Sequence, residues 1–141
     1  MRNGKFLTAM AVGVLTGVIG AASMGYAQNG PDGTKVTPLA AQAFGDLAGK
    51  EGLMLTVEYA PGASSPIHRH DAHVFVYVLE GSIVMGAEGK PAVTLGPGQT
   101  FYESPEDVHA VSKNASSSQS AKFVVFMVKA KGAPPVLPVK Q

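Results

Sequence analysis

The sequence predicts an all-β domain in which short strands form a sandwich or a closed barrel. Runs rich in β-branched and aromatic residues recur at near-regular spacing through residues 53–128. Glycine or proline interrupts nearly every gap between these runs, as at 89–91 and 96–98. Only the stretch 39–50 has a composition that suits a helix, and its internal glycines weaken that prediction.

Each expected strand is a short apolar run that ends at residues typical of turns. The first run, 53–59, is followed by Pro61 and Gly62, and the run 74–79 is followed by Gly81. We expect the other strands at 82–85, 92–95, 100–103, 108–112 and 122–128.

The 141-residue chain has room for one domain, which we expect over residues 51–131. Residues 1–27 resemble a signal peptide, with a short basic start, an apolar stretch and small residues before a cleavage site after Ala27. A retained membrane anchor is the alternative, but several glycines and threonines weaken the apolar stretch. We therefore expect an exported protein, periplasmic or secreted, with an N-terminal extension at 28–50 and a proline-rich tail at 132–141.

Charge and cysteine content exclude several classes of function. The predicted signal peptide holds two of the 11 basic residues, which leaves 9 against 10 acidic residues in the mature chain. A nearly neutral domain without a basic patch is not expected to bind nucleic acid or an anionic membrane surface. The chain has no cysteine, so any metal must be held by nitrogen and oxygen ligands.

The strand 74–79 is apolar on both faces. It carries valines at its even positions and Phe75, Tyr77 and Leu79 at its odd positions, and side chains alternate between the two faces of a strand. Only one face of a small barrel can point inward, so we expect the other to meet a second copy of the chain. The predicted homodimer would also pack the N-terminal segment and the C-terminal tail at its interface.

The histidines are confined to two segments. Three of the four, His68, His70 and His73, fall within six residues, and His109 follows a later strand and turn. His68 and His70 are two residues apart, so on an extended backbone their rings project to the same side. Neutral imidazole is the commonest metal ligand in proteins, and the pattern indicates a site for one divalent ion.

Two segments resemble the two sequence motifs of the cupin family. The first, 62–81, contains Gly-x5-His-x-His, and the second, 98–114, contains Gly-x10-His. The segment between them, 82–97, is short, as in single-domain microbial members. The resemblance covers 53–128 and implies a double-stranded β-helix, or jelly-roll, barrel with a metal ion inside. The ligands that it implies are His68, His70 and His109.

The chain departs from the family pattern at one ligand position. Cupins usually carry a metal-binding glutamate seven residues before the glycine that matches Gly81, and this chain has Val74 there. His73 is adjacent in sequence, although strand alternation points it away from Val74. Glu103 lies in an otherwise apolar strand, where it either faces solvent or needs a partner or a metal. A third possibility is a site with three histidines and no further protein ligand.

The expected function is that of a small metal-dependent oxidoreductase that resembles quercetinase-like or diketone-cleaving cupins. A divalent ion (iron, manganese, copper, nickel or zinc) would bind an enol, diketone or aromatic diol together with dioxygen, with Glu103 or His73 as a base or ligand. Two alternatives stay open, because one fold hosts many activities. They are a non-enzymatic protein that binds a metal or small ligand, and a metal-dependent isomerase or lyase.

Overall fold

The computed structural model describes residues 28–30 and 32–139, and within these ranges it contains eleven strands and no helix. The predicted signal peptide, 1–27, lies outside the described residues. No helix long and apolar enough to cross a bilayer is present in the part that is described. The strands are β1 (Gln28–Asn29), β2 (Thr34–Ala43), β3 (Lys50–Tyr59), β4 (His68–Arg69), β5 (Ala72–Glu80), β6 (Ile83–Ala87), β7 (Val93–Leu95), β8 (Thr100–Glu103), β9 (Val108–Asn114), β10 (Ala121–Ala130) and β11 (Leu137–Pro138).

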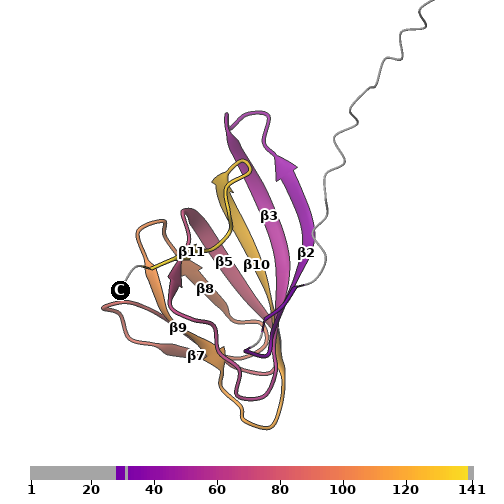
Figure 1. Cartoon of the computed structure of the whole chain (residues 1–141), viewed down its shortest axis with the longest axis vertical. Helices are drawn as coiled ribbons and strands as arrows, with labels where there is room; N and C mark the ends of the chain where they lie inside the picture. The colour runs from indigo at the N-terminus through magenta and orange to yellow at the C-terminus, as the bar shows by residue number, and fades with distance from the viewer. Residues whose placement is uncertain (1–27, 31, 140–141) are drawn as a thin grey trace, which may run out of the picture.

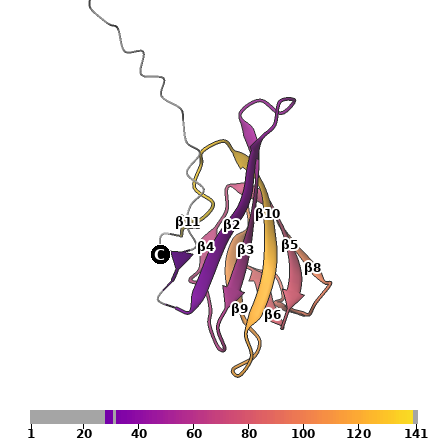
Figure 2. The same cartoon turned by 90° about the vertical axis from the view of Figure 1, so that its right-hand side faces the viewer.

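The strands form two antiparallel sheets that face each other (Figure 1). The six-stranded sheet has the order β1-β2-β3-β10-β5-β8, and Figure 2 shows β2, β3, β10, β5 and β8 side by side. The five-stranded sheet has the order β11-β4-β9-β6-β7. Non-consecutive strands lie next to each other in both sheets, as expected for a jelly-roll, so the all-β barrel prediction is confirmed.

Alternation along β5 and β10 turns one face of each strand into the core between the sheets. The even-numbered residues of β5 from Ala72 to Val78 are buried, and its odd-numbered residues are exposed. In β10 the buried positions include Phe123, Val125 and Met127. Burying one side chain of this kind contributes roughly 1.5–3 kcal/mol, so the two strands supply much of the core that holds the sheets together.

The outer face of the six-stranded sheet is apolar, as the pattern of residues 74–79 predicts. Phe75, Tyr77 and Tyr102 each expose about half of their side-chain surface there. Phe75 contacts Tyr102 and Phe126, with ring centroids 5.1 and 6.5 Å apart. The homodimer expected on this face stays a prediction.

The stretch 39–50, the only one whose composition suits a helix, is not helical. Strand β2 continues to Ala43, a loop follows, and β3 begins at Lys50. The pairing of β2 with β3 extends from Thr34↔Tyr59 to Ala43↔Glu51, with an irregularity between Pro38 and Ala40. This long ladder satisfies the backbone groups of the segment, and it outweighs the weak helical propensity of the sequence.

The C-terminal tail folds back on its own barrel. Strand β11 pairs with β4 through Leu137↔Arg69 and Pro138↔His68, so it forms one edge of the five-stranded sheet. The tail therefore lies beside the segment that carries the first two histidines. The expectation that the tail packs at a dimer interface stays a prediction.

Candidate metal centre

Strand pairing brings the three predicted histidine ligands together. His68 in β4 is directly opposite His109 in β9, and their ring centroids are 4.9 Å apart. His70 follows β4 on the same side of the backbone, and its ring centroid lies 4.8 Å from that of His68. One ring nitrogen from each of the three residues lies within 4.8 Å of the others, a spacing suited to a shared ion.

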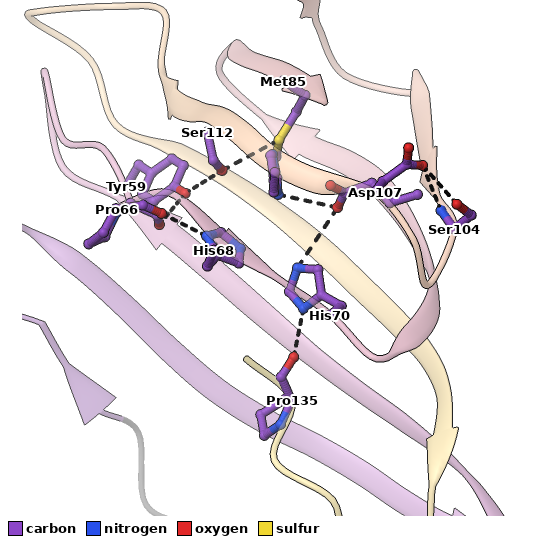
Figure 3. Close-up of polar contacts among 12 residues, drawn as sticks. Tyr59, Pro66, His68, His70, Met85, Ser104, Asp107, Ser112 and Pro135 are labelled. Atoms are coloured by element: carbon purple, nitrogen blue, oxygen red, sulfur yellow. Dashed lines mark hydrogen bonds and ion pairs between the residues drawn. The ribbon is translucent and has the colours of Figure 1, made fainter. Parts of the chain in front are cut away.

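Two of these imidazoles are held by backbone carbonyl groups. His68 Nδ1 donates to the carbonyl oxygen of Pro66 at 2.7 Å, and His70 Nδ1 donates to that of Pro135 at 2.6 Å (Figure 3). Since a carbonyl oxygen only accepts, the proton of each neutral ring must lie on Nδ1. Nε2 therefore keeps its lone pair, and carbonyl groups of this kind commonly orient metal-binding histidines.

Glu103 reaches the histidines from the opposite sheet. It is the last residue of β8, only 1% of its surface is exposed, and its Oε2 lies 3.2 Å from His109 Nδ1 and 3.8 Å from His70 Nε2. Neither carboxylate oxygen has a hydrogen-bond partner among the described residues. Of the two orientations expected for Glu103, the structure therefore has the inward one and not the solvent-facing one. A buried carboxylate is costly unless it meets a cation or a hydrogen-bond donor.

The register explains how a carboxylate reaches this level of the barrel without a glutamate at position 74. Val74 in β5 is 1% exposed, lines the same cavity and lies directly opposite Glu103 in β8. Cross-strand partners have Cβ atoms only about 4.5–5.5 Å apart. The carboxylate that the family pattern places on β5 is thus delivered from the adjacent strand.

His73 does not join the cluster, and its assignment as a fourth ligand is corrected. It lies on the outer face of β5, exposed to solvent, and its Nδ1 makes a 2.8 Å hydrogen bond with the Tyr102 hydroxyl. Strand alternation is the cause, because its neighbours Ala72 and Val74 both point inward. A catalytic role in this site is excluded for the same reason.

The histidines and Glu103 line a cavity of about 420 Å³ between the sheets. Most of its wall is apolar, which lowers the local dielectric constant and strengthens electrostatic interactions inside. The apolar residues that line it include Val36, Leu55, Val57, Val74, Val76, Met85, Phe123, Val125 and Met127. Phe101 stacks on the ring of His109, with centroids 6.2 Å apart, and thereby packs against one ligand.

Three hydroxyl groups form a second polar cluster in this cavity, which sequence reasoning missed. The Tyr59 hydroxyl hydrogen-bonds to Ser65 Oγ at 2.6 Å and to Ser112 Oγ at 2.7 Å, and Ser112 donates to Met85 Sδ (Figure 3). Burial raises the pKa of Tyr59, so the phenol stays protonated at neutral pH. The sequence contains a pattern that could have predicted the inward position of Tyr59. Side chains alternate along β3, so Tyr59 shares the inward face of Leu55.

Burial also controls the charge of the histidines. The pKa values of His68 and His70 are lowered from the ordinary 6.5, chiefly because desolvation disfavours the imidazolium form. The bonded carbonyl groups and Glu103 oppose this shift, and the neighbouring His109 adds to it. Both rings are therefore neutral at pH 7, which is the form that binds a metal.

The donor set fits a divalent transition metal. Three imidazoles and one carboxylate suit iron, manganese, copper, nickel or zinc, and no soft sulfur ligand is needed. Glu103 and both nitrogens of His109 are buried without a hydrogen-bond partner among the described residues, so a cation between them would satisfy groups that are otherwise orphaned.

Comparisons with known proteins agree with this architecture. The profile of the Cupin domain family Cupin_2 matches residues 55–127. No curated protein shows a significant match.

Three solved structures illustrate the range of similar proteins. The chain is 17% identical to an RmlC-like cupin from Shewanella frigidimarina NCIMB 400, with a TM-score of 0.60 over 76% of this chain and 86% of that one. It is 23% identical to the polyketide cyclase RemF from Streptomyces resistomycificus, with a TM-score of 0.62 over 82% of this chain and 80% of that one. It is 25% identical to an oxalate oxidase, with a TM-score of 0.59 over 78% of this chain and 57% of that one.

The lowered histidine pKa values predict how the stability of the metal-free protein depends on pH. Below pH 6.5 the unfolded chain binds protons at His68 and His70 that the folded chain does not, so its free energy of unfolding must fall as the pH falls. Urea denaturation of metal-free protein between pH 8 and pH 5 measures this slope.

The control is the double variant His68→Gln and His70→Gln, measured in the same way. It retains His73 and His109, and it should lose stability less steeply over this pH range. Equal slopes for the two proteins would contradict the assignment of depressed pKa values to these residues.

Proposed function

This chain belongs to the cupin family, and on that premise we propose that it is a metal-dependent enzyme that oxidises a small enol, diketone or aromatic diol with dioxygen. The observation that carries the proposal is the set of three imidazoles facing a buried carboxylate at an apolar cavity. A divalent metal there would supply Lewis acidity and open positions for substrate oxygen and dioxygen. The residues that would hold it are His68, His70, His109 and Glu103.

The cavity supports a small, mainly apolar substrate. Its volume of about 420 Å³ lies within the usual range of about 300–1,000 Å³ for small-molecule sites. The apolar wall favours an aromatic or alkenyl body, and the histidine end favours a pair of oxygen atoms on that body. The hydroxyl cluster of Tyr59, Ser65 and Ser112 offers a second polar contact that would orient a substrate with an oxygen atom elsewhere.

Glu103 gives the site a base as well as a ligand. Its carboxylate accepts no hydrogen bond from the described residues, so its electron pairs are not already shared with a donor. This favours a second candidate function, a metal-dependent lyase, isomerase or cyclase that only moves protons. The similarity to a polyketide cyclase is compatible with that candidate.

The cellular location of the protein and its oligomeric state are also part of the proposal. The basic start and apolar stretch of residues 1–27 support export to the periplasm or the outside of the cell. The apolar outer face of β5 and β8 supports a homodimer.

Dioxygen consumption separates the two candidates. Protein loaded in turn with iron, manganese, copper and nickel should consume dioxygen with at least one member of a panel of enols, diketones, catechols and flavonols. The His109→Ala variant should consume none, since it lacks one of the three imidazoles. Conversion of a panel member without dioxygen uptake would contradict oxidation and favour the lyase or isomerase. If no metal-loaded form of the protein converts any member of the panel, both enzymatic candidates are contradicted. A non-enzymatic binding protein is then the better account.

A carboxylate exchange tests the role of Glu103. Glu103→Val should lower the affinity for Mn²⁺ or Co²⁺ by at least about tenfold, because it removes the oxygen ligand. Adding Val74→Glu to that variant returns a carboxylate from the paired strand, at the position that other cupins use, and should restore most of the affinity. Isothermal titration of both variants and the wild type measures this.

Val74→Glu alone is the matched control for the exchange. It places a second carboxylate opposite Glu103, so metal-free protein should lose stability through repulsion between like charges. If Glu103→Val binds metal as tightly as the wild type, Glu103 is not a ligand and its role as a base remains.

A further inference from the structure

The C-terminal tail crosses one side of the cavity that holds the candidate metal centre. Pro135, Val136 and Pro138 line this cavity, and Pro138 is paired directly with His68. In Figure 3 Pro135 lies next to His70, and the dashed line joins its carbonyl oxygen to the imidazole. A segment remote in sequence therefore reaches one of the metal ligands.

A partly buried ion pair holds the start of the tail where it leaves β10. Lys129 is only 4% exposed, and its Nζ donates to Glu51 Oε1 at 2.5 Å and to the Ala133 carbonyl oxygen at 2.6 Å. The backbone N–H of Gly132 donates to the same Glu51 oxygen. The hydrogen bond from Lys129 lowers the pKa of Glu51, so the Glu51 carboxylate is charged at neutral pH.

The proline content of the tail suits it to hold a carbonyl group in place. Pro134 and Pro135 each have a fixed φ and no backbone N–H, so the segment loses little entropy on docking and cannot fold into a helix. Lys129 holds the start of the segment, and the pairing of β11 with β4 holds its end. The Pro135 carbonyl oxygen is thereby fixed between two anchors.

The two carbonyl-bonded histidines differ in where their acceptors come from. The acceptor for His68 is Pro66, two residues away in the same loop. The acceptor for His70 is Pro135, 65 residues away. Displacing the tail would therefore release His70 and leave the support of His68 intact.

We propose that the tail is a positioning element of the metal centre: the Pro135 carbonyl oxygen keeps the proton of His70 on Nδ1 and so presents its Nε2 lone pair to the metal. This inference rests on the proposed metal site. Residues that orient a metal-binding histidine in this way typically change metal affinity by about 10- to 100-fold when they are lost. The tail thus sets the affinity of the site without contributing a ligand.

The test displaces the tail without deleting it. Insertion of two glycines after Ala133 keeps every tail side chain but removes the fixed geometry between Lys129 and Pro135. The matched control carries the same two glycines after Val139, beyond β11. A second displaced variant ends the chain at Ala133. It contains no inserted glycines, so an effect shared by both variants comes from loss of the tail and not from the insertion.

The direct readout is the protonation of each imidazole nitrogen, from ¹⁵N NMR of the metal-free protein at pH 8. The wild type and the control should show His68 and His70 with the proton on Nδ1. Both displaced variants should show His70 exchanging between its two tautomers and His68 unchanged. If His70 keeps its proton on Nδ1, the proposal is overturned. If His68 changes to the same extent as His70, the effect is general loosening and the proposal is overturned as well.

Titration with Co²⁺ gives the second readout. The displaced variants should bind Co²⁺ about 10- to 100-fold more weakly than the control. If the wild type binds Co²⁺ and the displaced variants bind it as tightly as the control does, the proposed role of the tail is overturned. The metal centre itself would then still be supported. If the wild type itself binds no Co²⁺, the metal centre fails, and the proposed role of the tail in metal affinity fails with it.

Discussion

A buried carboxylate must meet a positive charge or a hydrogen-bond donor, and the arrangement of this site follows from that constraint. Glu103 enters from one sheet, and His68, His70 and His109 face it from the other. Two groups of this site, Glu103 and His109, have no hydrogen-bond partner among the described residues. The apolar packing that holds the sheets together therefore also creates the dry environment in which a cation would be held tightly.

Sequence alone predicted the parts of this structure that depend on local pattern. Alternation in β5 identified the buried valines and placed His73 on the opposite face from Val74, and the spacing of His68 and His70 indicated rings on one side. The identification of His109 as their partner needed the family resemblance, because 39 positions separate it from His70. The direct pairing of β4 with β9 gives that resemblance its physical basis.

The remaining features depend on contacts between distant segments. The sequence left Glu103 equally suited to solvent and to the interior, and only its pairing with Val74 decides between them. The strand at 34–43 was not predicted, because its ladder with β3 is not visible in local propensity. The contact of Pro135 with His70 is of the same kind, since no local pattern relates a proline-rich tail to a histidine motif.

We propose that three imidazoles and one carboxylate hold one metal ion in this chain. Elemental analysis and X-ray absorption spectroscopy of protein purified from its native compartment test it most directly. We expect one transition metal ion per chain, with scattering from three imidazole rings and at least one oxygen ligand at about 2.0–2.2 Å. Protein that is fully folded and active without metal, or an ion whose spectrum shows fewer than two imidazoles, would contradict it.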